Sequence, residues 1–104
     1  MPRLSDLLQG VSDARIATGD GEVLIREVRD DSRLVQAGDL FIAVPGTKLD
    51  GRRFIDDAKA KGAAAILTEE GGASPGGATA LVVVPNARLA LSLVAANRYQ
   101  AARP

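Results

Sequence analysis

The sequence predicts a small single α/β domain with a mainly parallel sheet flanked by helices. Its 104 residues suffice for one hydrophobic core and leave little room for a second. Three short runs are apolar at successive positions, as is typical of strands covered on both faces. These runs are Leu40–Val44, Ala63–Leu67 and Leu81–Val84. Strands and helices alternate in the second half of the chain, which predicts parallel pairing with right-handed crossovers.

The first half of the chain is predicted to supply a helix and a strand before the first apolar run. Apolar residues recur at helical spacing between positions 4 and 11, which predicts a short helix. Residues 16–21 are polar and contain glycine, so they form a loop or a weak strand. Glu22–Val28 is rich in β-branched residues and is predicted to be a strand.

Two helices are predicted in the second half. Within Arg52–Lys61, helical spacing puts Phe54, Ile55 and Ala58 on one apolar face, which is predicted to pack on the core. Acidic residues lie early and lysines late in this segment, which complements the helix dipole, and Gly62 follows as a stop signal. Glu69–Thr79 is rich in glycine and is predicted to be a surface loop. After the last strand, Asn86 is a suitable N-cap for a long helix. The stripe of this helix that faces the core is predicted to carry Leu89, Leu93, Val94 and Asn97.

The composition excludes several classes of function. Thirteen basic and thirteen acidic residues cancel, so no net field attracts nucleic acid or an anionic membrane. Aromatic residues make up 3% of the chain, which removes the stacking platforms of single-strand binders. The absence of cysteine excludes disulfides and cysteine-based zinc sites, and the absence of histidine excludes a Ser-His-Asp triad. No segment reads as a membrane span or signal peptide, so a cytoplasmic location is expected.

Two polar loops, Asp30–Arg33 and Gly46–Gly51, lie at opposite ends of the first apolar run. Residue types alone favour a structural role for both, as an Asx turn and a polar connection with glycines for positive φ. The alternative is a ligand site, because the Ser32 hydroxyl offers one donor and two acceptors. For Arg33 the alternative to a ligand contact is to brace its loop through Asp31 or Asp39.

The glycine-rich stretch Gly71–Gly77 does not fit a phosphate-binding loop. A P-loop requires G-x-x-x-x-G-K-[ST] between a strand and a helix, and no lysine or helix start follows here. Phosphoryl transfer depends on such positioning and charge neutralisation. We therefore expect no catalytic residue, no metal site and no cofactor in this chain.

A spaced set of residues from Asp31 to Ile55 carries a family resemblance: DSR-x-V-x-x-GDLF-x-A-x-x-G-x-x-x-DG-x-x-F-I. With the GAAAIL segment that follows, this set resembles the N-terminal domain of the Mur ligases, which build the peptidoglycan precursor. The opening LSDLL and the closing NARLALSLVAANRYQ look most like the MurE type. The resemblance implies a mixed sheet and a UDP-binding domain over residues 1–104. It also implies that the central ATP-binding domain and the C-terminal domain are absent from this chain.

The resemblance also implies which residues bind the UDP-sugar. In MurE-type ligases the serine of the DSR set and the residue two before it contact this substrate; these are Ser32 and Asp30 here. An acid at position 30 departs from the family pattern, and since Asp30 would repel a phosphate, we expect a contact through its backbone. Three loop residues line the uracil and ribose. Thr47 would hydrogen-bond the base edge or ribose, Lys48 would pair with a phosphate, and Leu49 would supply an apolar wall.

The implied parent enzyme is an ATP- and magnesium-dependent ligase. It would form an acyl phosphate on UDP-N-acetylmuramoyl-L-alanyl-D-glutamate, which meso-diaminopimelate or L-lysine then attacks. This chain would anchor the nucleotide end beside the remaining domains of the parent and would be inactive alone. Two alternatives stay open: a MurF-type domain, whose substrate is the tripeptide precursor, and a non-catalytic interaction or regulatory module of the same fold.

Overall fold

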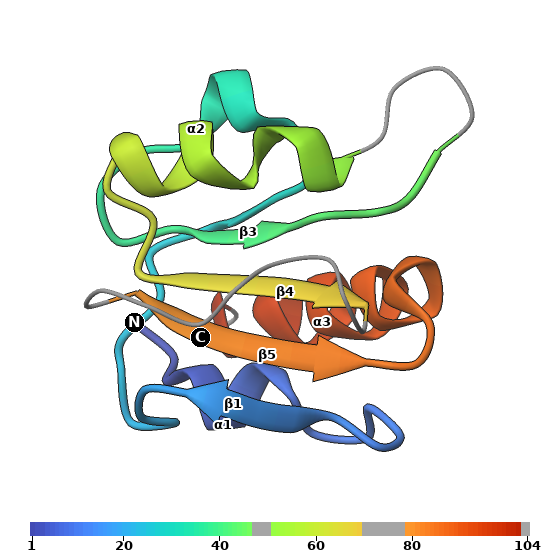
Figure 1. Ribbon diagram of the computed structural model, residues 1–104. Coiled ribbons are helices and arrows are strands. Elements are labelled where there is room, and N and C mark those ends of the chain that lie inside the picture. The colour runs from blue at the N-terminus through green and yellow to red at the C-terminus, as the bar shows by residue number, and fades with distance from the viewer. Residues whose placement is uncertain (47–50, 70–78, 103–104) are drawn as a thin grey trace.

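The computed structural model describes residues 1–46, 51–69 and 79–102 of the chain, with short 3₁₀ turns between its helices and strands (Figure 1). In chain order the elements are α1 (Leu4–Leu7), β1 (Arg15–Thr18), β2 (Val28–Arg29), η1 (Ser32–Leu34), β3 (Leu40–Ile42), η2 (Gly51–Phe54), α2 (Ile55–Ala60), β4 (Ala65–Glu69), β5 (Ala80–Val84) and α3 (Ala87–Ala102).

In the described part of the chain, five strands form one mixed sheet with the order β1-β5-β4-β3-β2. The three pairs from β2 to β5 are parallel, and β1 pairs with β5 in the antiparallel sense. Strand β3 is flanked on both sides, as its apolar sequence predicts. The strand ends at Ile42, but the Ala43 N–H still donates to the Leu67 carbonyl at 2.8 Å. The predicted α/β fold with a mixed, mainly parallel sheet is confirmed.

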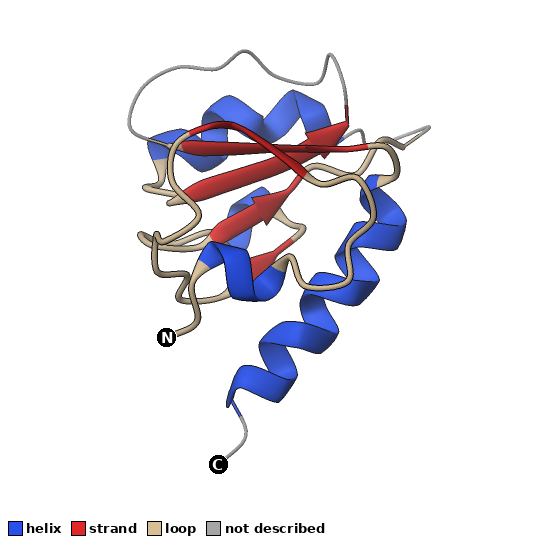
Figure 2. Cartoon of the chain, turned by 90° about the horizontal axis from the view of Figure 1, so that it is seen from below, coloured by secondary structure: helices blue, strands red, loops and turns tan. Residues whose placement is uncertain are grey.

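Helices cover both faces of the sheet, with α1 and α3 on one side and α2 on the other (Figure 2). Because side chains alternate along a strand, successive residues of β3 enter different cores. Leu40 and Ile42 pack with residues of α1 and α3, whereas Phe41 packs with Ile55 and Ala58 of α2. All three β3 side chains are fully buried. This double coverage explains why the central strand lacks polar alternation.

The predicted strand over Glu22–Val28 is wrong for most of its length, because only Val28 belongs to a strand of the sheet. The backbone before it bonds with the N-terminus instead. The Leu4 N–H donates to the Val23 carbonyl at 2.8 Å, and the Ile25 N–H donates to the Pro2 carbonyl at 2.8 Å. Ile25 is fully buried in the core that also holds Leu4. The β-branched residues are therefore covered by a segment distant in sequence.

Other boundaries shift by a few residues. The first helix covers only Leu4–Leu7 of the predicted stretch, and the weak strand expected after it is β1. Strand β4 begins two residues later than the apolar run Ala63–Leu67 suggests. The prediction of a surface loop over Glu69–Thr79 falls mostly outside the described residues.

The predicted helix over Arg52–Lys61 is divided into the 3₁₀ turn η2 and the α-helix α2. Ile55 and Ala58 are buried as predicted, but Phe54, assigned to the same face, is 36% exposed. Gly62 ends α2 with a φ of +93°, in the left-handed region that favours glycine. The predicted stop signal is thus confirmed, while the altered first turn moves Phe54 out of the core.

Helix α3 begins as the sequence predicts, but its buried face is rotated. The Asn86 Oδ1 accepts the Leu89 N–H at 3.0 Å, which confirms the N-cap. The buried side chains include Ala90 and Val94, whereas Leu89 is 57% exposed, so its prediction as a core residue is wrong. Asn97 does face inward, since its Nδ2 donates to the Leu7 carbonyl at 2.9 Å. Helix α3 is therefore anchored to the end of α1 through a side-chain amide.

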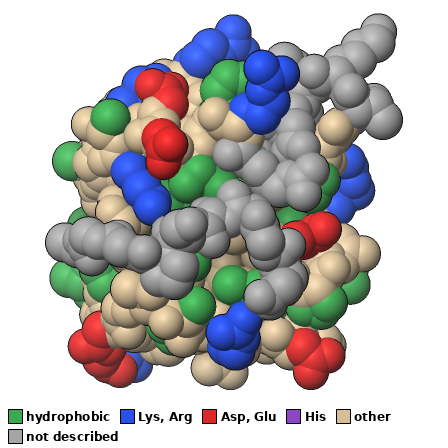
Figure 3. Space-filling model, in the orientation of Figure 1, with side chains coloured by type: hydrophobic (Ala, Val, Ile, Leu, Met, Phe, Trp, Pro, Cys, Tyr) green, Lys and Arg blue, Asp and Glu red, His purple; other side chains and the backbone are tan. Residues whose placement is uncertain are grey.

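The surface carries charges of both signs. On the face seen in Figure 3, acidic and basic side chains are interspersed, in keeping with the zero net charge of the sequence. Among the helices within residues 1–46, 51–69 and 79–102, none is long and apolar enough to cross a membrane.

Candidate functional site

A pocket of about 610 Å³ lies where the chain leaves β2 and β3. Ligands of open parallel sheets bind beyond the carboxyl ends of the strands, and this volume is typical of a small-molecule site. The pocket is formed by two strand exits, one turn and the start of α3. Its lining residues are Asp30, Asp31, Ser32, Arg33, Val44, Pro45, Gly46, Phe54, Arg88 and Leu91.

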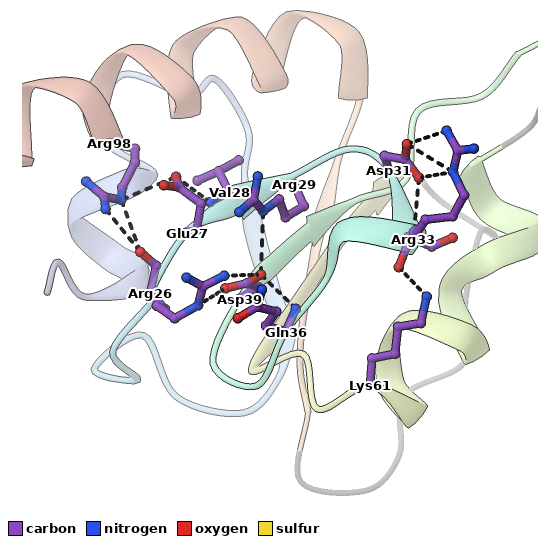
Figure 4. Close-up of polar contacts among 11 residues, drawn as sticks. Arg26, Glu27, Val28, Arg29, Asp31, Arg33, Gln36, Asp39, Lys61 and Arg98 are labelled. Carbon is purple, nitrogen blue, oxygen red and sulfur yellow. Dashed lines mark hydrogen bonds and ion pairs between the residues drawn. The ribbon is translucent and has the colours of Figure 1, made fainter.

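The turn after β2 is held by an ion pair between two of its own residues. The Asp31 Oδ1 accepts the Arg33 N–H at 2.9 Å, which caps the 3₁₀ turn η1. The Arg33 side chain folds back onto the same carboxylate, with Nη2 2.7 Å from Oδ2 and Nε 3.0 Å from Oδ1 (Figure 4). Arg33 therefore braces its loop through Asp31, one of the two predicted partners. The structural prediction of an Asx turn is confirmed for Asp31.

The pairing makes Asp31 a stronger acid. Hydrogen bonds from the Arg33 side chain and backbone lower the pKa of Asp31 from 3.8 to about 2. A depressed folded-state pKa adds stability that is fully present above the unfolded value and is lost as the pH falls through about 2. In Arg33→Gln we expect the Asp31 pKa to rise towards 3.8, only part of the way because the backbone bond remains. Carboxyl ¹³C NMR titration measures this change.

The matched control for this titration is Arg53→Gln, which removes an exposed arginine that does not line the pocket. We expect Arg53→Gln to leave the Asp31 pKa where it is. An Asp31 that titrates at the same pH in the wild type and in Arg33→Gln would show that the ion pair does not form in solution.

Ser32 is positioned from the neighbouring helix layer. Ser32 is 6% exposed and lines the pocket. Its carbonyl accepts a hydrogen bond from the Lys61 Nζ at 2.7 Å (Figure 4). The Lys61 Nζ also pairs with the Asp57 Oδ2 at 3.3 Å. Asp30 also lines the pocket and is exposed. The structure thus places both predicted binding residues of this loop in one pocket.

A buried ionic cluster supports the same region from the start of β3. The Asp39 carboxylate is fully buried, with Oδ1 2.8 Å from the Arg26 Nε and Oδ2 3.7 Å from the Arg29 Nε. It also accepts the Gln36 N–H at 2.9 Å and the Arg26 Nη2 at 3.0 Å. Arg98 of α3 donates to the Arg26 carbonyl at 3.1 Å (Figure 4). This cluster joins β2, the turn before β3 and α3 at the amino end of β3, and its residues do not line the pocket.

The opposite wall was not predicted from the sequence. Arg88 and Leu91 come from the first turns of α3, and the Arg88 Nη2 donates to the Pro45 carbonyl at 3.4 Å. Phe54 completes the apolar part of the wall. One signal for Arg88 exists in the sequence, because a cation in the first turn of a helix opposes the dipole and suggests another role. No comparable signal marks Leu91.

The second predicted loop is only partly described. Gly46, where the described chain stops, lines the pocket. The predicted binding residues Thr47, Lys48 and Leu49 lie outside the described residues.

The residues present do not fit an ATP–magnesium site. The full sequence has no P-loop, and a P-loop supplies the backbone amides and lysine that hold a triphosphate. Within the described ranges, no three or more acidic, histidine or cysteine side chains cluster so that they could hold a metal ion.

Comparison with known proteins identifies the family. The model of the Mur ligase family, catalytic domain, matches residues 24–99. The 2,6-diaminopimelate-adding UDP-N-acetylmuramoyl-L-alanyl-D-glutamate ligase of Ectopseudomonas mendocina is 50% identical over 86 residues, covering 81% of this chain and 18% of that protein. The protein of the same name from Bradyrhizobium diazoefficiens is 42% identical over 99 residues, covering 95% of this chain and 20% of that protein. The chain spans about a fifth of the length of these relatives.

Solved structures give the same family. A crystal structure of MurF from Acinetobacter baumannii superposes with a TM-score of 0.69 at 25% identity, covering 95% of this chain and 21% of that one. MurF ligase from Thermotoga maritima in complex with ADP gives 0.61 at 30% identity, over 77% of this chain and 18% of that one. Sequence identity is higher to the diaminopimelate ligases, which favours the MurE type over the MurF type. The resemblance predicted from the sequence is confirmed, and the chain belongs to the Mur ligase family.

Proposed function

We propose that this chain is the N-terminal domain of a MurE-type ligase and anchors the UDP end of its nucleotide-sugar substrate. The observation that carries the proposal is the single pocket wall shared by the turn Asp30–Arg33 and by Gly46. The family resemblance assigns the UDP-sugar contacts to residues of this turn and to the residues that follow Gly46. A binding role explains why the Asp30–Arg33 turn and Gly46 line one pocket at the carboxyl ends of neighbouring parallel strands.

The pocket offers the mixture of groups that a nucleotide needs. Apolar side chains of Val44, Phe54 and Leu91 suit the faces of a uracil ring. Ser32 offers hydrogen-bonding groups on a turn that Lys61 holds in place. The exposed Asp30 carboxylate disfavours an anion beside it, so its contact is assigned to the backbone. In the same proposal Thr47 bonds the base edge or ribose, Lys48 pairs with a phosphate and Leu49 extends the apolar wall.

The parent enzyme would join diaminopimelate, named in the relatives, to UDP-N-acetylmuramoyl-L-alanyl-D-glutamate. ATP and magnesium would be held by other domains, since the residues of this chain do not fit them. This domain contributes binding energy far from the reacting carboxylate, which serves to position that group. The substrate and the rest of the parent ligase are therefore its expected partners.

The proposal is tested by substituting Ser32. In an amide NMR titration with UDP-N-acetylmuramoyl-L-alanyl-D-glutamate, Ser32→Ala is expected to weaken binding by roughly five- to tenfold, the usual worth of one hydrogen bond. The control is Ser12→Ala, which changes an exposed serine that does not line the pocket and should bind as the wild type does. Equal affinities for the wild type and Ser32→Ala would remove Ser32 from the site.

A further inference from the structure

Two acidic and two basic side chains line the pocket, and one acid and one arginine among them pair with each other. Asp31 and Arg33 neutralise each other through contacts of 2.7 to 3.2 Å. Arg88 has no acidic side chain within ion-pair distance among the residues that the structure describes. Its guanidinium donates one long hydrogen bond, at 3.4 Å to the Pro45 carbonyl. With respect to the residues that the structure describes, most of its five N–H donors are thus available to a ligand in the pocket.

The position of Arg88 is not explained by the stability of α3. A cation in the first helical turn faces the positive end of the helix dipole, which is unfavourable. Two orphan amides of this turn already have acceptors, since the Ala87 N–H donates to the Glu69 Oε2 at 2.9 Å and the Leu89 N–H donates to the Asn86 Oδ1 at 3.0 Å. Capping therefore does not require the Arg88 side chain, which lines the pocket with its positive group.

We infer that Arg88 binds a phosphate group of the nucleotide held in this pocket, an inference that rests on the proposed function. A guanidinium presents paired donors that match two phosphate oxygens, and such charge-assisted bonds are stronger than neutral ones. Arg33 lines the same pocket but is already committed to Asp31. Arg88 also offsets the repulsion that the Asp30 carboxylate exerts on an entering anion. Ser32 and the apolar wall would then contact the nucleoside, and Arg88 would add a guanidinium to the groups that contact the phosphates.

The test is a titration of UDP into the 104-residue chain, followed by amide NMR. Arg88→Gln is expected to weaken UDP binding by roughly tenfold or more, the range of a hydrogen bond to a charged group. Arg88→Lys keeps the positive charge but lacks the paired N–H donors of the guanidinium. Its affinity for UDP is therefore expected to lie between those of the wild type and Arg88→Gln. The control Arg53→Gln removes the same charge from an exposed residue that does not line the pocket, and it should leave the affinity within about twofold. The melting temperature of Arg88→Gln should match that of the wild type, which a purely structural role would not allow.

The outcomes separate this inference from the proposed function. If the wild type binds UDP and Arg88→Gln binds it equally well, or if Arg53→Gln loses as much affinity, the assignment of Arg88 is wrong and the nucleotide site stands. If the wild type binds no UDP at millimolar concentration, both the nucleotide site and the role of Arg88 are wrong. A loss confined to the Arg88 variants, with lysine intermediate, supports both.

Discussion

Asp39→Asn is expected to lower the free energy of unfolding by about 3 kcal/mol, a large part of the 5–15 kcal/mol typical of small domains. The wild-type carboxylate is fully buried and faces Arg26 and Arg29. Removing its charge leaves two guanidinium groups without their counterion and weakens the acceptor of the Gln36 N–H. Both arginines remain about one-third exposed and reach water in part, which places the loss at the lower end of the range for broken buried pairs. Urea unfolding followed by circular dichroism measures this change.

Asp6→Asn is the matched control for this substitution. Asp6 pairs with Arg3 at 3.3 Å, but both side chains are more than two-fifths exposed. Exposed ion pairs add little, so the same chemical change at Asp6 should lower the free energy of unfolding far less than Asp39→Asn does. Equal losses at the two positions would contradict the assignment of the Asp39 cluster as the ionic anchor of the β2–β3 region.

Phe41→Ala is expected to cost about 4 kcal/mol, which leaves the domain close to unfolding at 25 °C. Phe41 is fully buried in β3 and fills the core beneath α2, where it packs with Ile55 and Ala58. Truncation loses the free energy gained by transferring the ring from water to the core, and it leaves a cavity. Because β3 is held between two strands, it cannot move to fill this cavity. The measurement is the denaturant midpoint of the variant at an unchanged slope.

Phe54→Ala tests whether the Phe54 ring belongs to the pocket and not to the hydrophobic core. Phe54 is 36% exposed and lines the pocket, so its truncation should cost less than about 1.5 kcal/mol of stability. It should instead weaken nucleotide binding, because the apolar wall is lost. A Phe54 variant as unstable as the Phe41 variant would place both rings in the core and contradict the structure.

The fold was predictable wherever burial is encoded in local pattern. Strand β3 is covered on both faces, so its apolar run at Leu40–Val44 was diagnostic without any partner being known. Ile25 illustrates the opposite case, because its backbone pairs with Pro2, far away in sequence. The prediction that Leu89 faces the core was wrong for another reason. Its helical spacing to Leu93 and Asn97 favoured Leu89 as a core residue, yet the buried face of α3 carries Ala87, Ala90 and Val94, which turns Leu89 outward.

Only the wall of the pocket formed by the Asp30–Arg33 turn could be predicted from the sequence. Asp30 and Ser32 belong to a continuous motif, and the structure places both in the pocket. Arg88 and Leu91 join them from the far end of the chain, and only the packing of α3 against the strand exits brings them there. Phe54 was assigned to the core because its spacing fits a regular α-helix, and the 3₁₀ turn η2 redirects it to the pocket.

The most direct test of the nucleotide-anchoring role is a map of amide shifts in the wild-type chain on titration with UDP-N-acetylmuramoyl-L-alanyl-D-glutamate. The account predicts saturable shifts concentrated at Asp30–Arg33, at Gly46 and the residues Thr47–Leu49, and at the start of α3 around Arg88. Shifts centred elsewhere, or none at millimolar ligand, would contradict it.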